Sequence, residues 1–129
     1  MSDNLPIKPT AAELEILQVI WHHGPASVRY VNDELNRKKQ VGYTTTLKLM
    51  QIMTEKGLLK RSEEGRKHIY NVVLKESVTK NLLLDKFVQT TFGGSAMDLV
   101  MQALGNHRTT PDELADLKAL IDKIERDNQ

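Results

Sequence analysis

The fold is decided by residues 41–73, which read VGYTTTLKLMQIMTEKGLLKRSEEGRKHIYNVV. The first part predicts a helix that begins near Tyr43, because apolar side chains recur every three or four residues until Gly57 can end it. The second part predicts two short strands, over 58–61 and 68–73, joined by a charged turn that contains glycine. The stretch therefore predicts a helix followed directly by a β-hairpin.

Two further helices are predicted upstream of this stretch. Thr10 and Glu13 form a capping box that opens the first helix, and a Gly-Pro pair ends it. Ser27 can cap the second helix, which runs into the basic residues 37–39. Three short helices followed by a hairpin is the element order of a winged helix-turn-helix domain, with the hairpin as the wing. We expect this domain to cover residues 1–74.

Residues 75–129 predict an all-helical tail. One helix is expected over 76–92, a second after Ser95 that Gly105 ends, and a third that begins after Thr110. Three helices with wide apolar stripes in about 50 residues cannot bury those stripes alone, because a small domain hides too little surface. We therefore expect this tail to be a dimerisation domain. The side chains expected at the dimer interface are Leu82, Leu83, Phe87, Leu99, Leu117, Leu120, Ile121 and Ile124.

The composition excludes several classes of protein. Hydrophobic residues make up 40% and charged residues 27% of the 129 residues, which is the balance of a globular chain rather than a disordered one. No apolar run approaches the roughly 20 residues of a membrane span, and the N-terminus does not resemble a signal peptide. The chain has no cysteine, so disulfides, thiolate nucleophiles and thiolate metal sites are excluded. We expect a cytoplasmic protein that has no cofactor and does not bind membranes directly.

Positive charge is concentrated in one part of a chain whose net charge is only +1. Between Arg37 and Lys67 there are 9 basic and 3 acidic residues, which gives this stretch a charge of +6. Residues 75–129 carry 7 basic and 9 acidic residues. A basic stretch of this kind is typical of a surface that binds a polyanion, although it could also be an ordinary solvated face.

The position of this charge in the predicted fold favours double-stranded DNA as the partner. In a helix-turn-helix, the start of the second helix meets base edges in the major groove. Here that helix begins at Tyr43 or Thr44, and its outward threonine, lysine and glutamine side chains suit contacts with bases and phosphates. Basic residues near the hairpin turn would lie beside the phosphate backbone. The predicted DNA-binding residues are Tyr43, Thr44, Thr45, Lys48, Gln51, Arg61, Arg66 and Lys67.

Other interpretations stay open at this point. Thr44 and Thr45 could serve only as helix caps, and residues 37–39 could contact phosphate or simply end the second helix in solvent. Arg29 is a further candidate for phosphate contact. The whole module could bind a protein instead of DNA, but the basic stretch and the polar outward face favour DNA. The sequence has no glycine-rich phosphate loop, nucleophile elbow or metal-ligand spacing, so we do not expect an enzyme.

Several motifs, taken in order, carry a resemblance to a known family. They are TAAELEIL over 10–17 with Trp21, VGYTTTL over 41–47, KGLLKR over 56–61, GR at 65–66 with IY at 69–70, and FGGS over 92–95. In this order they resemble the penicillinase-repressor (BlaI/MecI) family of bacterial regulators over nearly the whole chain. The resemblance implies a winged-helix homodimer that binds an inverted-repeat operator and represses transcription.

The resemblance also implies a way in which repression ends. In this family, a membrane-bound sensor metalloprotease relieves repression by causing cleavage of a helix in the tail. The corresponding bond lies between Gln102 and Ala103, where neither residue matches the Asn-Phe pair of the best-known members. The copper-responsive branch of the family binds its metal through cysteines, so a chain without cysteine does not fit that branch.

Overall fold

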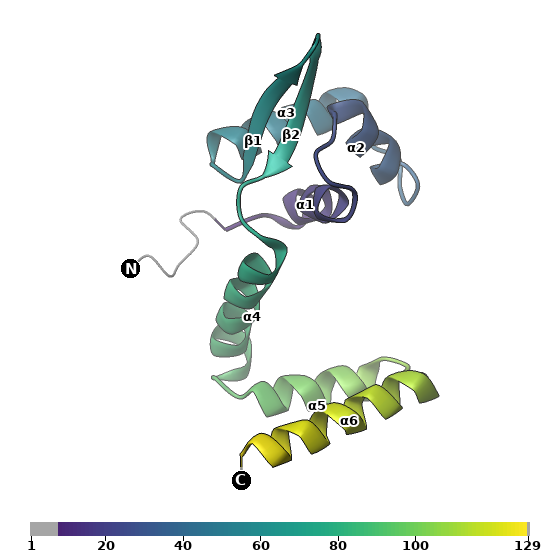
Figure 1. The fold of residues 1–129 in the computed structure, drawn as a ribbon, viewed down its shortest axis with the longest axis vertical. Helices are drawn as coiled ribbons and strands as arrows, with labels where there is room; N and C mark the ends of the chain where they lie inside the picture. Colours follow the sequence, from purple (N-terminus) through teal and green to yellow (C-terminus); the bar gives the residue numbers. More distant parts are fainter. Residues whose placement is uncertain (1–7, 129) are drawn as a thin grey trace. The chain divides into compact units, whose positions relative to one another are not determined.

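The computed structural model describes residues 8–128. Its contacts divide the chain into two compact units, one up to Leu83 and one from Leu84 onward. Figure 1 labels the elements in chain order. They are α1 (Ala11–His23), α2 (Val28–Leu35), α3 (Tyr43–Glu55), β1 (Leu59–Glu64), β2 (Lys67–Val72), α4 (Glu76–Phe92), α5 (Ala96–Asn106) and α6 (Pro111–Asp127). The unit boundary falls inside α4, and the predicted division into functional domains at residue 74 stays a prediction.

Local capping fixes the starts of the first two helices as expected. The Thr10 hydroxyl accepts from the Glu13 amide at 3.2 Å, and the Glu13 carboxylate accepts from the Thr10 amide at 2.9 Å. The Ser27 hydroxyl accepts from the Tyr30 amide at the start of α2. The end of α2 was predicted too far along the chain. This helix ends at Leu35 with Asn36 as its C-cap, so residues 37–39 lie beyond it.

The third helix begins at Tyr43, as the sequence predicted, but no threonine caps it. Its N-cap is Gly42, and no side chain accepts a hydrogen bond from its first turn. Thr44 and Thr45 lie inside the helix with exposed side chains, so the alternative that they act only as caps is wrong. The first amides of α3 therefore have no side-chain acceptor in the described structure.

The hairpin has a longer first strand and a tighter turn than the sequence predicted. β1 and β2 are antiparallel, and their register runs from Leu59 opposite Val72 to Glu64 opposite Lys67. Only two residues, Gly65 and Arg66, connect the strands, so the predicted turn residues before Gly65 belong to β1. Gly65 has a φ of +66°, which suits the first central position of a two-residue hairpin turn and disfavours other residues there.

The core of the first unit lies between α1, α2, α3 and the base of the hairpin (Figure 1). Its buried side chains are Ile16, Leu17, Ile20, Ala26, Val28, Val31, Met50, Met53, Leu58, Leu59 and Tyr70. The backbones of Ala26 and Tyr70 exchange two hydrogen bonds, of 2.8 and 3.0 Å, which pair the α1–α2 connection with β2. The Trp21 indole donates to the Leu74 carbonyl and ties the chain after β2 to α1. This arrangement confirms the predicted winged helix-turn-helix fold.

The tail is helical, as expected. α4 has the predicted bounds, and Thr110 and Glu113 form a capping box at the start of α6. Gly105 was expected to end α5 but lies inside it, because one glycine costs a helix only about 1 kcal/mol. Among the described residues, none on α5 or α6 is buried. No helix within residues 8–128 is both long enough and apolar enough to span a membrane.

Candidate nucleic-acid interface

The exposed face of α3 carries the five side chains predicted to contact DNA. Tyr43, Thr44, Thr45, Lys48 and Gln51 are all exposed. The opposite face packs into the core through Thr46, Met50 and Met53, each of which is fully buried. The 3.6-residue period separates the two faces, as the apolar pattern of the helix requires. The helix therefore presents hydroxyl, ammonium and amide groups to solvent along one side.

A buried polar cluster joins α2 to α3 across the turn between them. The Asn32 amide donates to the Thr46 hydroxyl at 2.8 Å and to the Val41 carbonyl at 3.0 Å. Asn36 adds bonds to the Val41 carbonyl and from the Val41 amide, of 2.9 and 3.1 Å. The cluster fixes the turn and the start of α3 to α2. The cluster could not be predicted from the sequence, because an asparagine in a helix has no distinctive local pattern.

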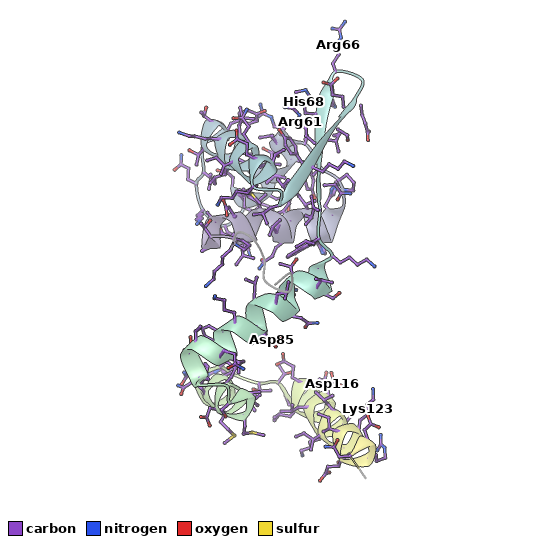
Figure 2. All side chains as sticks on the ribbon, turned by 90° about the vertical axis from the view of Figure 1, so that its left-hand side faces the viewer. Arg61, Arg66, His68, Asp85, Asp116 and Lys123 are labelled. Carbon is purple, nitrogen blue, oxygen red and sulfur yellow. The ribbon has the colours of Figure 1, made fainter. Side chains whose placement is uncertain are left out.

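The wing adds cationic side chains beside this face of α3. Figure 2 shows Arg66 at the free end of the hairpin, and Arg61 and Lys67 are exposed on its strands. Arg61 and Gln51 line the same hollow, of about 570 Å³. The hollow therefore brings one predicted helix contact, Gln51, together with one predicted wing contact, Arg61.

A second groove lies between the N-terminal ends of α2 and α3 and the wing. Its volume is about 410 Å³, and its lining includes Arg29, Tyr43, Arg66 and Lys67. The Arg29 guanidinium lies over the Tyr43 ring, with its carbon atom 4.8 Å from the ring centre. This is a cation–π contact, and it holds the charged end of Arg29 at the groove.

Part of the basic stretch is neutralised within the fold. Arg37 lies 3.3 Å from Glu34, and Lys39 lies 3.4 Å from Glu15 on α1. Both are exposed pairs, which contribute little to stability but lower the local positive charge. Among the charged residues between 37 and 67, those of α3 and the wing are therefore better placed to attract a polyanion than those after α2.

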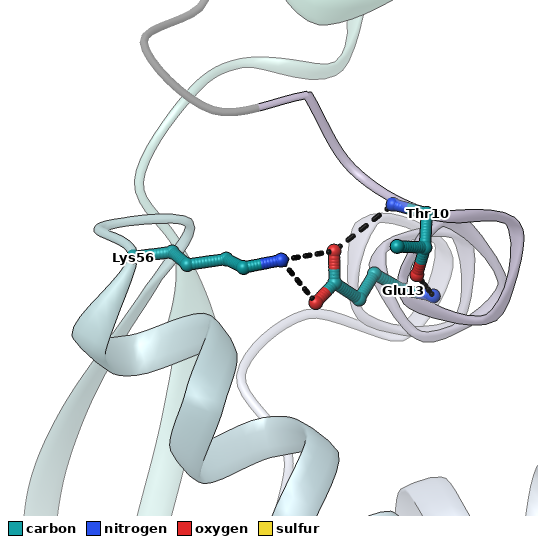
Figure 3. A network of polar contacts seen from close by, with 3 residues as sticks. All are labelled: Thr10, Glu13 and Lys56. Atoms are coloured by element: carbon teal, nitrogen blue, oxygen red, sulfur yellow. Dashed lines mark hydrogen bonds and ion pairs between the residues drawn. The ribbon is translucent and has the colours of Figure 1, made fainter.

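A third ion pair, between Lys56 and Glu13, ties the end of α3 to the start of α1 (Figure 3). The Lys56 ammonium lies 2.8 and 3.2 Å from the two carboxylate oxygens of Glu13. The Glu13 side chain is only 3% exposed, and that of Lys56 is 25% exposed. Burial raises the pKa of Glu13, but the hydrogen bonds from Lys56 and Thr10 outweigh it and leave the pKa below its ordinary value. The carboxylate is therefore charged at neutral pH.

Comparison with known proteins gives consistent results over most of the chain. A family model described as penicillinase repressor matches residues 9–123. The penicillinase repressor of Bacillus licheniformis is 25% identical over 87% of this chain and 88% of its own length. The methicillin resistance regulatory protein MecI of Staphylococcus aureus is 23% identical over 94% of this chain and 98% of its own length. The solution structure of the DNA-binding domain of the repressor BlaI is 30% identical, with a TM-score of 0.50, over 55% of this chain and 87% of that domain.

Proposed function

The chain belongs to the penicillinase repressor family of transcriptional repressors, and on that premise we propose that it acts in the cytoplasm as a homodimer on an inverted-repeat operator. The resemblance inferred from the sequence motifs and the expectation that the chain is no enzyme are both confirmed by this assignment. The observation that carries the proposal is the polar face of α3 beside the cationic wing. In a helix-turn-helix this face enters the major groove, while the wing residues contact the backbone.

DNA binding across a salt series tests this function. We expect tight binding to DNA from upstream of the protein's own gene and weak binding to scrambled DNA. The affinity should fall steeply as salt rises, by about one unit of log–log slope for each phosphate neutralised. Equal binding of the wild type to both DNAs would favour a protein-interaction module instead.

In the same assay, Lys48→Ala should weaken binding by about tenfold and change the preferred sequence, because its ammonium faces bases or phosphates.

The exposed apolar side chains of the tail support the homodimer. Phe87, Leu120, Ile121 and Ile124 are 47–52% exposed, and Leu82, Leu83, Leu99 and Leu117 are partly exposed. Monomeric proteins rarely leave so many large apolar side chains in water, and a symmetric partner would cover them. A dimer also places two reading helices on the two halves of an inverted repeat.

Charge on the tail should separate the subunits. Leu120→Glu with Ile124→Glu places two carboxylates on the apolar side of α6, and we expect monomers by sedimentation and at least a hundredfold weaker operator binding. Ala119→Glu adds a carboxylate on the opposite side of the same helix and should remain dimeric. A double variant that stays dimeric and binds the operator tightly would contradict the proposed interface.

Derepression by a sensor protease is a separate prediction. Gln102 and Ala103 are exposed on α5, which supports access to the bond between them. The bond lies inside a helix, so its cleavage requires α5 to open locally. Controlled expression with a candidate sensor protease, followed by mass spectrometry of the repressor fragments, tests this bond directly.

A further inference from the structure

We propose that the groove between α2, α3 and the wing holds one phosphate of the DNA backbone, with Arg29 as its main cation and the Tyr43 ring as the support of that cation. This proposal rests on the proposed DNA-binding function and assigns Arg29 and Tyr43 separate roles within it. Arg29 supplies charge and hydrogen bonds to the phosphate. Tyr43 positions the guanidinium instead of reading a base.

The first argument is the charge of the groove. Arg29, Arg66 and Lys67 line it, and none of its lining residues is acidic. His68 also lines it, and its nearest acidic partner, Glu63, is 3.4 Å away on the opposite strand. Among the described residues, Arg29 has no carboxylate within 4.0 Å, in contrast to Arg37 and Lys39. The groove therefore concentrates positive charge that the fold does not use internally.

The second argument is the way in which Arg29 is held. Its guanidinium carbon lies 4.8 Å from the centre of the Tyr43 ring, and Tyr43 is the first residue of α3. The ring holds the guanidinium carbon at this distance, and a planar guanidinium can form two parallel bonds to a phosphate. Because the side chain is already held before DNA arrives, the loss of side-chain entropy on binding is smaller.

The third argument is the backbone around the groove. The N-terminal ends of α2 and α3 both reach it, since Ser27 caps α2 and Tyr43 opens α3. Helix N-termini carry partial positive charge and unpaired amides, which favour phosphate. The Ser27 hydroxyl occupies only the Tyr30 amide, and α3 has no side-chain cap. The backbone therefore adds to the cationic side chains instead of opposing them.

The test compares salt slopes of matched variants of the full-length chain. We expect Arg29→Gln to weaken binding to operator and scrambled DNA by the same factor, about tenfold, and to lower the log–log salt slope by about one unit. Tyr43→Leu should weaken binding by a smaller factor and leave the slope unchanged, while Tyr43→Phe should match the wild type. Arg37→Gln removes the same charge beyond the other end of α2 and should leave the slope unchanged.

The outcomes separate this proposal from the wider function. An Arg29→Gln variant that unfolds like the wild type and keeps the wild-type salt slope would overturn the phosphate site while leaving operator binding intact. A change of sequence preference in Arg29→Gln would also overturn it, because a phosphate contact carries no base code. If millimolar inorganic phosphate binds in the groove while Arg29→Gln has no effect on DNA binding, the ligand is a free anion instead of the DNA backbone. Failure of the wild type to bind DNA would remove the proposed function and this site together.

Discussion

Asn32→Asp is expected to lower the free energy of unfolding by about 3 kcal/mol at neutral pH. The Asn32 side chain donates from a buried position to the Thr46 hydroxyl and the Val41 carbonyl. An aspartate of nearly the same shape cannot donate to that carbonyl when charged, and it brings a negative charge out of water. Because the cluster also fixes the start of α3, operator affinity should fall even at temperatures where the variant remains folded.

Urea unfolding followed by circular dichroism measures this effect, and a double-mutant cycle shows its origin. Thr46→Val removes only the acceptor and should cost about 1 kcal/mol. Asn32→Leu should cost about 2 kcal/mol, because the Thr46 hydroxyl loses its buried donor and the Val41 carbonyl keeps only the bond from Asn36. The two together should cost clearly less than their sum, since two apolar groups leave no unpaired partner at Thr46. Strict additivity would mean that the 2.8 Å bond carries no stabilisation of its own.

The helix starts could be predicted because their causes lie within four residues of sequence. Thr10 with Glu13, and Thr110 with Glu113, form the reciprocal hydrogen bonds that their spacing predicts. α4 also has its predicted bounds, since its apolar period is uninterrupted up to the glycines that follow Phe92. In each of these places local preference and the final fold agree.

The errors arise where distant contacts decide the structure. The turn of the wing was predicted over 62–65, but β1 continues up to Gly65 because pairing with β2 outweighs the weak β-propensity of Ser62 and the glutamates after it. The polar cluster of Asn32 joins residues 14 positions apart, and Glu13 meets Lys56 across 43 positions. Neither contact has a periodic pattern that a sequence reveals.

The candidate site shows the same division. The exposed side of α3 follows from helical periodicity alone, so its five residues could be chosen from the sequence. The cationic side chains that remain available for DNA could not be chosen in this way. Their availability depends on the acidic residues that folding brings close to them. Arg37 and Lys39 acquire such partners, while Arg29 acquires an aromatic ring.

Lys56→Met is expected to lower the free energy of unfolding by about 3 kcal/mol at neutral pH, more than Glu13→Gln at about 1 kcal/mol. The difference arises because Glu13 is buried and Lys56 is partly in solvent. Without Lys56, a charged carboxylate stays buried with only the hydrogen bond from the Thr10 amide. Without the charge of Glu13, the ammonium can turn towards water, and the glutamine oxygen can still accept from the Thr10 amide.

Two further measurements test whether the larger loss in Lys56→Met arises from the unpaired charge of Glu13. Adding Glu13→Gln to Lys56→Met should recover part of the lost stability, because it removes the unpaired buried charge. The folded-state pKa of Glu13 lies below its ordinary value of 4.5, so the contribution of the pair is complete above that value and is lost as pH falls through the folded pKa. Lys56→Met removes the cation that lowers this pKa, so Glu13 takes up its proton at a higher pH in the variant than in the wild type. The gap in unfolding free energy between the two proteins should therefore narrow as pH falls through these two pKa values. A constant gap, or a double variant less stable than Lys56→Met, would show that Lys56 stabilises the fold through packing of its alkyl chain rather than through its charge.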